Sequence, residues 1–211
     1  MSKSSIISIV LLVFIVLAVG NIFRTCKPEG STLDVQNFGG LGGYAARQIH
    51  EFLGPKKRVV LILFDDSAAT IYGKDQYALT EQLKAYEYKI LAEETIPAGP
   101  LFSNPRATHQ GILPLESYQQ VASRHPDADA IISFVGPPVV SSETMPSGGR
   151  PPLIVANTVA ERSTRTLVQN GFVTMAILSR KDAAATPMEM GYGDSAQYAN
   201  FYEVVTYESI E

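Results

Sequence analysis

The longest uninterrupted hydrophobic run of the chain comes first, at residues 6–23. It carries no charge, and only Ser8, Gly20 and Asn21 reduce its hydropathy. A helix rises about 1.5 Å per residue, so a run of this length just spans a hydrocarbon core of roughly 30 Å. Because every side of this helix is apolar, the run predicts a membrane-spanning segment rather than a helix of a soluble core.

Two alternatives compete with a membrane anchor for this run. A cleavable signal peptide would use Lys3 as its basic start and residues 18–20, Ala-Val-Gly, as a small-x-small cleavage site. A lipoprotein anchor needs small residues directly before a cysteine, whereas residues 23–25, Phe-Arg-Thr, precede Cys26. We favour a signal-anchor helix that is not cleaved.

Basic residues are nearly balanced across this helix, with Lys3 before it and Arg24 and Lys27 after it. The positive-inside rule therefore does not orient the helix. Because single N-terminal anchors most often export the domain behind them, we expect the rest of the chain to lie on the periplasmic side of the membrane. The predicted organisation is a transmembrane anchor at residues 1–26, a linker at 27–43 and a soluble α/β domain at 44–211.

The linker ends in the glycine-rich sequence GGLGG, at residues 39–43. Such loops hold phosphate when a strand precedes them and a helix comes after, because backbone N–H groups then face the anion. Here no strand precedes, and the Lys-Ser/Thr pair of a phosphate-binding loop is absent. The segment is therefore interpreted as a linker and a helix start. The apolar face of that helix consists of Leu41, Ala45, Ile49, Phe52 and Leu53.

Strands and helices alternate after this first helix. Residues 58–64 form a continuous apolar run, which is typical of a strand covered on both faces. Further strands are predicted at 89–96, 130–135, 153–156, 172–178 and 201–207, with helices at 79–90, 114–125 and 158–170. This alternation predicts a three-layer α/β domain with an open, mostly parallel, Rossmann-like sheet. The last strand is a candidate antiparallel edge.

Local signals mark the ends of several elements. Thr158 and Glu161 have the spacing of a capping box, and Gly171 is suited to a helix C-cap. Residues 136–152 are rich in glycine and proline, so they predict an exposed excursion without regular structure.

Two stretches resemble a known fold. Residues 59–73, VVLILFDDSAATIYG, join a strand to a helix, and residues 127–132, DADAII, enter a later strand. In this order they resemble one lobe of the type I periplasmic-binding-protein fold, over about residues 57–180. Members of that family trap a solute between two lobes, whereas this chain has the length of a single lobe. The resemblance therefore implies the fold but leaves capture by cleft closure in doubt.

Charge and residue content exclude several function classes. Of the 17 basic residues only Lys3 and Arg24 precede Lys27, so 15 basic and 21 acidic residues make up the rest of the chain, a net charge of about −6. No basic cluster of the kind that nucleic acids require is present. Cys26 is the only cysteine, and the three histidines share no ligand spacing, so we expect no cofactor and no metal.

Ligands of open α/β sheets bind beyond the carboxyl ends of the strands. The residues predicted at that edge are Asp65, Asp66, Ser67, Gly136, Asn157 and Thr158. Paired carboxylates such as Asp65 and Asp66 can hold Mg²⁺, but neighbouring strand ends offer only Lys181 as a further group. An acidic turn is the simpler interpretation. Ser67 lacks a nucleophile elbow and no set of nucleophile, base and orienting group is found, so enzymatic activity is not favoured.

The sequence favours a non-catalytic accessory or scaffolding subunit that packs beside other subunits of a larger membrane complex. The segment with Met188, Met190, Tyr192 and Tyr198 is a candidate contact surface, because Met and Tyr are enriched at interfaces. One alternative is a tethered solute-binding module of the single-lobe type that uses the strand-end edge. Another is a Mg²⁺-dependent enzyme that uses Asp65 and Asp66.

Overall fold

The computed structural model describes residues 40–65, 71–97, 113–140, 150–158, 161–180 and 195–210. All of them belong to the unit formed by residues 36–211. Within these ranges, no helix has the length and hydropathy of a membrane span. The predicted anchor at residues 6–23 and Cys26 lie outside the described residues, so the anchor stays a prediction.

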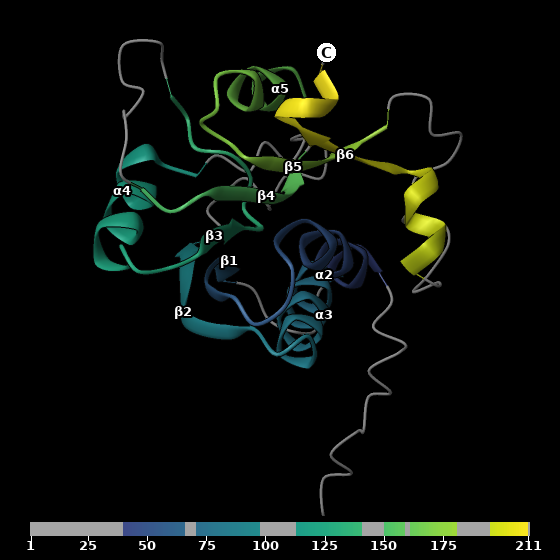
Figure 1. Cartoon of the computed structure of the whole chain (residues 1–211), viewed down its shortest axis with the longest axis horizontal. Coiled ribbons are helices and arrows are strands. Elements are labelled where there is room, and N and C mark those ends of the chain that lie inside the picture. Colours follow the sequence, from purple (N-terminus) through teal and green to yellow (C-terminus); the bar gives the residue numbers. More distant parts are fainter. Residues whose placement is uncertain are drawn as a thin grey trace, which may run out of the picture. The chain divides into compact units, whose positions relative to one another are not determined.

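Six strands of the described residues form one sheet in the order β2-β1-β3-β4-β5-β6 (Figure 1). Strands β1 to β5 are parallel, and β6 pairs antiparallel with β5 at one edge. This confirms the predicted mostly parallel open sheet and its antiparallel edge strand. The strands are β1 Arg58–Asp65, β2 Lys89–Pro97, β3 Ala130–Ser133, β4 Leu153–Thr158, β5 Met175–Ser179 and β6 Tyr202–Thr206.

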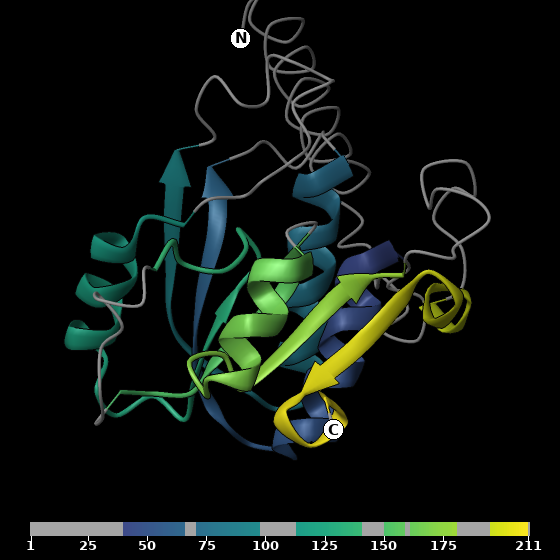
Figure 2. The ribbon, with the colours of Figure 1, turned by 90° about the horizontal axis from the view of Figure 1, so that it is seen from above.

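Helices cover both faces of this sheet. Figures 1 and 2 show α2 and α3 on one face and α4 and α5 on the other, which gives three layers. The helices are α2 Gly40–Leu53, α3 Ile71–Ala85, α4 Leu115–Arg124 and α5 Glu161–Gln169, with the short 3-10 helices η4 Ser195–Asn200 and η5 Tyr207–Ile210.

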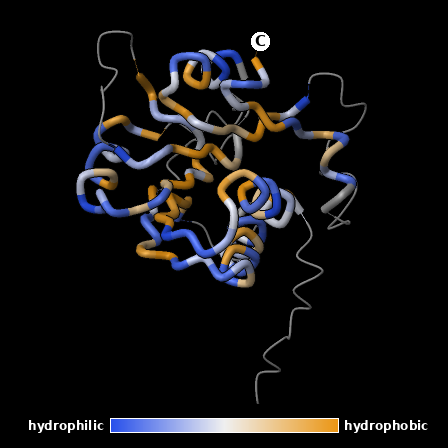
Figure 3. Tube along the Cα trace, viewed as in Figure 1, coloured by the Kyte–Doolittle hydropathy of each residue, from blue (hydrophilic) through white to orange (hydrophobic). Residues whose placement is uncertain are grey.

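The side chains of β1 alternate between two hydrophobic clusters. Val59 and Leu61 pack in the cluster beneath α2 and α3, whereas Val60 and Ile62 pack in the cluster beneath α4 and α5. All four are fully buried, which explains the continuous apolar sequence of this strand. Figure 3 shows hydrophobic positions along the strands. Each such side chain stabilises the fold by about 1.5–3 kcal/mol when it is buried.

Some element ends differ from the prediction. The helix expected to reach Ile90 ends at Ala85. Glu87 adopts a φ of 62°, and the N–H of Tyr88 donates to the C=O of Leu83 at 3.0 Å, so the chain turns at once into β2. Ile90 is an apolar residue of β2 that happens to lie at helical spacing from the apolar residues of α3. The pattern therefore predicts a helix that is too long.

Two glycines with positive φ angles lie just beyond the ends of β3 and α5. Beyond β3, Gly136 has a φ of 113°, and its C=O accepts a hydrogen bond from the buried hydroxyl of Ser133 at 2.7 Å. This turn ends β3 two residues before the predicted end. Gly171 has a φ of 69° after α5, which confirms the predicted helix C-cap. The predicted capping box at 158–161 includes residues outside the described ranges and stays a prediction.

Candidate functional site

The carboxyl ends of β1, β3 and β4 meet at one edge of the sheet, named here the carboxyl edge. Asp65 ends β1 with an exposed side chain, and Asn157 and Thr158 end β4. Gly136 lies just beyond β3 and is buried. The fold therefore brings these four predicted site residues to the same edge.

Two other predicted site residues, Asp66 and Ser67, lie outside the described residues. In the part of the chain that the structure describes, no group of three His, Cys, Asp or Glu side chains could hold a metal ion. Asp66 is half of the predicted magnesium pair, so the magnesium hypothesis stays untested.

A buried carboxylate from α3 meets the first turn of α2 at the same edge. The Asp75 carboxylate accepts hydrogen bonds from the backbone N–H groups of Gly42, at 3.4 Å, and Leu41. Burial raises the pKa of Asp75 to about 6, and the two N–H groups oppose that rise. The first N–H groups of a helix have no partner within the helix, so Asp75 caps α2 from a neighbouring helix.

Gly42 makes this contact between the two helices possible. A Cβ atom at position 42 would lie 1.8 Å from the backbone oxygen of Asp75 and 2.8 Å from the backbone nitrogen of Leu79. Helices α2 and α3 thus cross with their backbones in contact, which only glycine permits. The GGLGG sequence therefore serves to bring two helices together. In a phosphate-binding loop the first N–H groups of the helix would bind the phosphate, whereas here they bind the carboxylate of Asp75.

The next residue, Gln76, ties the start of α3 to the end of β1. Its side-chain oxygen accepts a hydrogen bond from the N–H of Phe64, and its side-chain nitrogen donates to the C=O of Phe64 at 3.3 Å. Gln76 is buried, so these bonds are shielded from water. They hold the last residues of β1 at the carboxyl edge.

We expect Gln76→Leu to lower the free energy of unfolding by about 1–3 kcal/mol, because it removes both hydrogen bonds while keeping the side chain's size. Chemical denaturation of the full chain in detergent measures this change. Gln120→Leu, at an exposed position of α4, is the control and should change stability by less than about 0.5 kcal/mol. Equal changes in the two variants would contradict the role given to Gln76.

Three tyrosines from three elements gather at the start of β6, and one of them, Tyr198, lies close enough to Asp75 for the carboxylate to affect it. The ring of Tyr198 on η4 stacks on that of Tyr202 at the start of β6, with centroids 6.1 Å apart and planes 14° apart. The ring of Tyr44 on α2 lies 6.3 Å from that of Tyr202. Arg180, directly after β5, donates from Nε to the backbone oxygen of Tyr202 at 3.1 Å. We name Tyr44, Asp75, Arg180, Tyr198 and Tyr202 the edge cluster.

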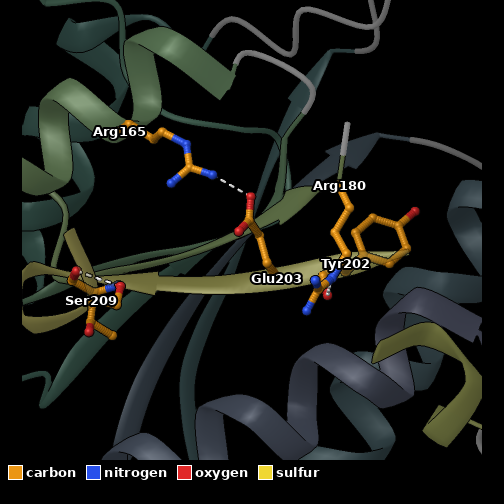
Figure 4. A network of polar contacts seen from close by, with 6 residues as sticks. Arg165, Arg180, Tyr202, Glu203 and Ser209 are labelled. Carbon is orange, nitrogen blue, oxygen red and sulfur yellow. Dashed lines mark hydrogen bonds and ion pairs between the residues drawn. The ribbon is translucent and has the colours of Figure 1, made fainter. Parts of the chain in front are cut away.

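Figure 4 shows Arg180 beside Tyr202, whereas the side chain of Glu203 points away to Arg165 of α5. Successive residues of β6 therefore serve opposite faces of the sheet, and Tyr202 belongs to the α2 face.

The hydroxyl groups of Tyr44 and Tyr198 stay protonated at neutral pH, because the pKa of each is raised above its usual value. Burial raises the pKa of Tyr44, although the positive charge of Arg180 opposes this. Burial also raises the pKa of Tyr198, and the nearby carboxylate of Asp75 raises it further. The cluster thus combines protonated hydroxyls, aromatic faces, a carboxylate and a guanidinium, all of them groups that bind neutral polar molecules.

Sequence reasoning missed most of this cluster. It predicts Tyr198 as a partner contact, but only 7% of this residue is exposed, because it packs against Tyr202. Met188, Met190 and Tyr192 lie outside the described residues, so the contact-surface prediction stays untested. One signal was available: the start of an antiparallel last strand must lie where the parallel strands end, which places Tyr202 at the carboxyl edge.

Comparisons with known proteins give matches in structure alone. No protein-family model matches the chain, and no curated protein matches its sequence. An ABC-transporter solute-binding protein from Burkholderia graminis, determined in complex with D-arabinose, matches with a TM-score of 0.50 and 15% identity. A periplasmic ribose ABC transporter from Conexibacter woesei gives 0.49 and 14%. A glucose-galactose binding protein from Geobacillus stearothermophilus gives 0.48 and 14%.

The matches differ in how much of each chain they include. They cover 81%, 83% and 81% of this chain, respectively, but only 60%, 59% and 60% of those proteins. Identities this low show the fold alone. The chain thus resembles periplasmic sugar-binding proteins in fold over an extent consistent with a single lobe, as the resemblance seen in its sequence predicted.

Proposed function

We propose that the chain is an extracytoplasmic, single-lobe solute-binding module that binds a small sugar at the carboxyl edge. The observation that carries this proposal is the likeness in fold to a solute-binding protein that was determined with D-arabinose bound. In open α/β sheets, ligands bind beyond the carboxyl ends of the strands, and that is where the polar and aromatic groups of this domain gather.

The chemistry of the carboxyl edge suits a sugar. Tyr202 is half-buried, and the side chain of Arg180 beside it is exposed. A sugar ring presents C–H groups that pack on an aromatic face and hydroxyls that bond to carboxylate and guanidinium groups. A single lobe covers such a ligand from one side, so we expect weaker binding than in a two-lobed protein that closes around its solute.

The proposal is tested by thermal denaturation of the full chain in detergent, with a panel of pentoses and hexoses. At about ten times its Kd, a bound sugar stabilises the folded state by about 1.4 kcal/mol, which raises Tm by about 3–6 °C for a domain of this size. We expect saturable stabilisation by at least one sugar. If no sugar in the panel raises Tm at any concentration, the proposal is wrong.

A matched pair of variants locates the effect. Arg180→Gln removes a charge at the carboxyl edge, and Lys89→Gln removes one at the opposite end of the sheet, at the start of β2. We expect the shift in Tm caused by the sugar to fall in Arg180→Gln and to persist in Lys89→Gln.

A further inference from the structure

The edge cluster is closed by a side chain of the chain itself. Tyr198 is carried by η4, a six-residue 3-10 helix. Its ring stacks on that of Tyr202, and Tyr198, Tyr44 and Asp75 are 7%, 5% and 7% exposed. Helices of this kind have poorer hydrogen-bond geometry than α-helices and are used in short pieces, so η4 can be displaced more easily than α2 or α3.

The groups near Tyr198 are polar for a protein interior. One of them is the carboxylate of Asp75, which accepts hydrogen bonds from the backbone N–H groups of Gly42 and Leu41. Another is the hydroxyl-bearing ring of Tyr44, which lies close enough to Arg180 for the guanidinium charge to affect it. Burying such groups is unfavourable compared with an apolar core of the same shape, and groups retained in this way are characteristic of binding sites.

We propose that Tyr198 is an internal occupant of a sugar subsite formed by Tyr44, Asp75 and Tyr202, and that a neutral six-membered sugar ring replaces it there. This inference rests on the proposed function, and it specifies both the place of the ligand and its competitor. Displacement of η4 would uncover the aromatic face of Tyr202 and the carboxylate of Asp75 together.

The size and chemistry of Tyr198 indicate what can take its place. Its side chain is a flat six-membered ring that stacks on Tyr202, with one hydroxyl near enough to Asp75 for the carboxylate to raise its pKa. A pyranose has a ring of the same size, C–H groups that can stack on an aromatic face, and several hydroxyls that can donate to a carboxylate. Asp75 and Arg180 carry opposite charges, so a ring of either charge would be repelled by one of them, and we infer a neutral sugar.

Calorimetric titration of the full chain in detergent with the sugar that raises Tm most tests this displacement. Removing the internal occupant in Tyr198→Ala should tighten binding at least tenfold. Tyr198→Phe keeps the stacked ring and should bind within about threefold of the wild type, while Tyr202→Ala should bind at least tenfold more weakly. Tyr77→Ala, at a position of α3 that is 47% exposed, is the control and should leave the affinity unchanged.

Hydrogen exchange of the wild-type chain gives a readout that does not depend on a variant folding. The N–H of Phe201 donates to the C=O of Tyr198 at 2.9 Å, so its exchange reports on η4. A saturating sugar should speed exchange at Phe201 at least tenfold, whereas an ordinary ligand slows exchange where it binds.

Each outcome decides between the two proposals. If a sugar binds the wild type and Tyr198→Ala equally well and exchange at Phe201 does not rise, the displacement proposal is overturned and the proposed function stands. If no sugar binds either protein, both proposals are overturned. Tighter binding by Tyr198→Ala than by the wild type, together with faster exchange at Phe201, supports both.

Discussion

Replacing Gly42 by alanine should destabilise the domain by about 3 kcal/mol or more, although alanine is the better helix former. Helix propensity alone would favour alanine by about 1 kcal/mol. Against this, the added Cβ would lie 1.8 Å from the backbone oxygen of Asp75, and backbone atoms cannot move aside as the end of a flexible side chain can. Overpacking of a tight core costs about 1–3 kcal/mol, and separating two helices also exposes the groups between them.

Denaturant titration monitored by circular dichroism measures this loss. Gly54→Ala is the matched control, because a Cβ there would have no atom within 4 Å and only the φ of 75° opposes it. That strain costs about 1–2 kcal/mol. Gly42→Ala should therefore be clearly the more destabilised of the two variants. A Gly42→Ala protein as stable as the wild type would show that α2 and α3 do not cross in backbone contact.

Replacing Asp75 by asparagine should stabilise the domain at pH 7–8, by up to about 3 kcal/mol. Burial raises the pKa of Asp75 from 3.8 to about 6, so the folded state holds a proton on this group more tightly than the unfolded state does. Each pKa unit corresponds to about 1.4 kcal/mol, so an ionised Asp75 destabilises the folded state by about 3 kcal/mol. Asparagine keeps an oxygen that can accept from Gly42 and carries no charge.

This raised pKa also sets the sign of the pH dependence. The stability that Asp75 contributes is complete well below pH 3.8, where the group is protonated in both states. It is lost as the pH rises through about 6. The difference between Asp75→Asn and the wild type should therefore be small at pH 4 and largest above pH 7.

Thermal denaturation at a series of pH values measures this difference. Asp127→Asn is the control, because it removes only an exposed ion pair with Arg58, which contributes about 0.5 kcal/mol. An Asp75→Asn protein that is less stable than the wild type at pH 8 would contradict the burial of an unfavourable charge. The stability gained should come with weaker sugar binding, since the same carboxylate is a ligand group in the proposed subsite.

The sheet could be predicted because its signals are local. A continuous apolar run at residues 59–63 indicates burial on both faces, and the structure places alternate residues of β1 in two separate clusters. The order of strands and helices then leaves few topologies, since crossovers between parallel strands are right-handed. Because the carboxyl ends of parallel strands lie at one edge of the sheet, the strand order also predicts the edge residues Asp65, Gly136, Asn157 and Thr158.

The edge cluster could not be predicted because it depends on distances between helices. Tyr44 and Asp75 each have helical spacing that is consistent with a core position, and nothing local shows that they lie beside one end of β6. Their meeting depends on the closeness of α2 and α3, which Gly42 permits. The sequence places Gly42 in a predicted linker that has no phosphate site. In the structure, Gly42 is the residue that brings the edge cluster together.

The accessory-subunit role inferred from the sequence stays a prediction, because it depends on the anchor at residues 6–23. It makes a separate claim about assembly: in mild detergent the chain should migrate with other membrane subunits. Migration at the mass of a monomer would count heavily against that role and would leave sugar binding unaffected.

An NMR titration of the full chain in detergent with the sugar that raises Tm most tests the central claim, binding at the carboxyl edge, most directly. We expect the backbone amide signals of Arg180 and Tyr202 at the carboxyl edge to shift saturably, while those of Arg58 and Lys89, at the opposite end of the sheet, do not. Shifts confined to the opposite end of the sheet, or no saturable shift at all, would contradict it.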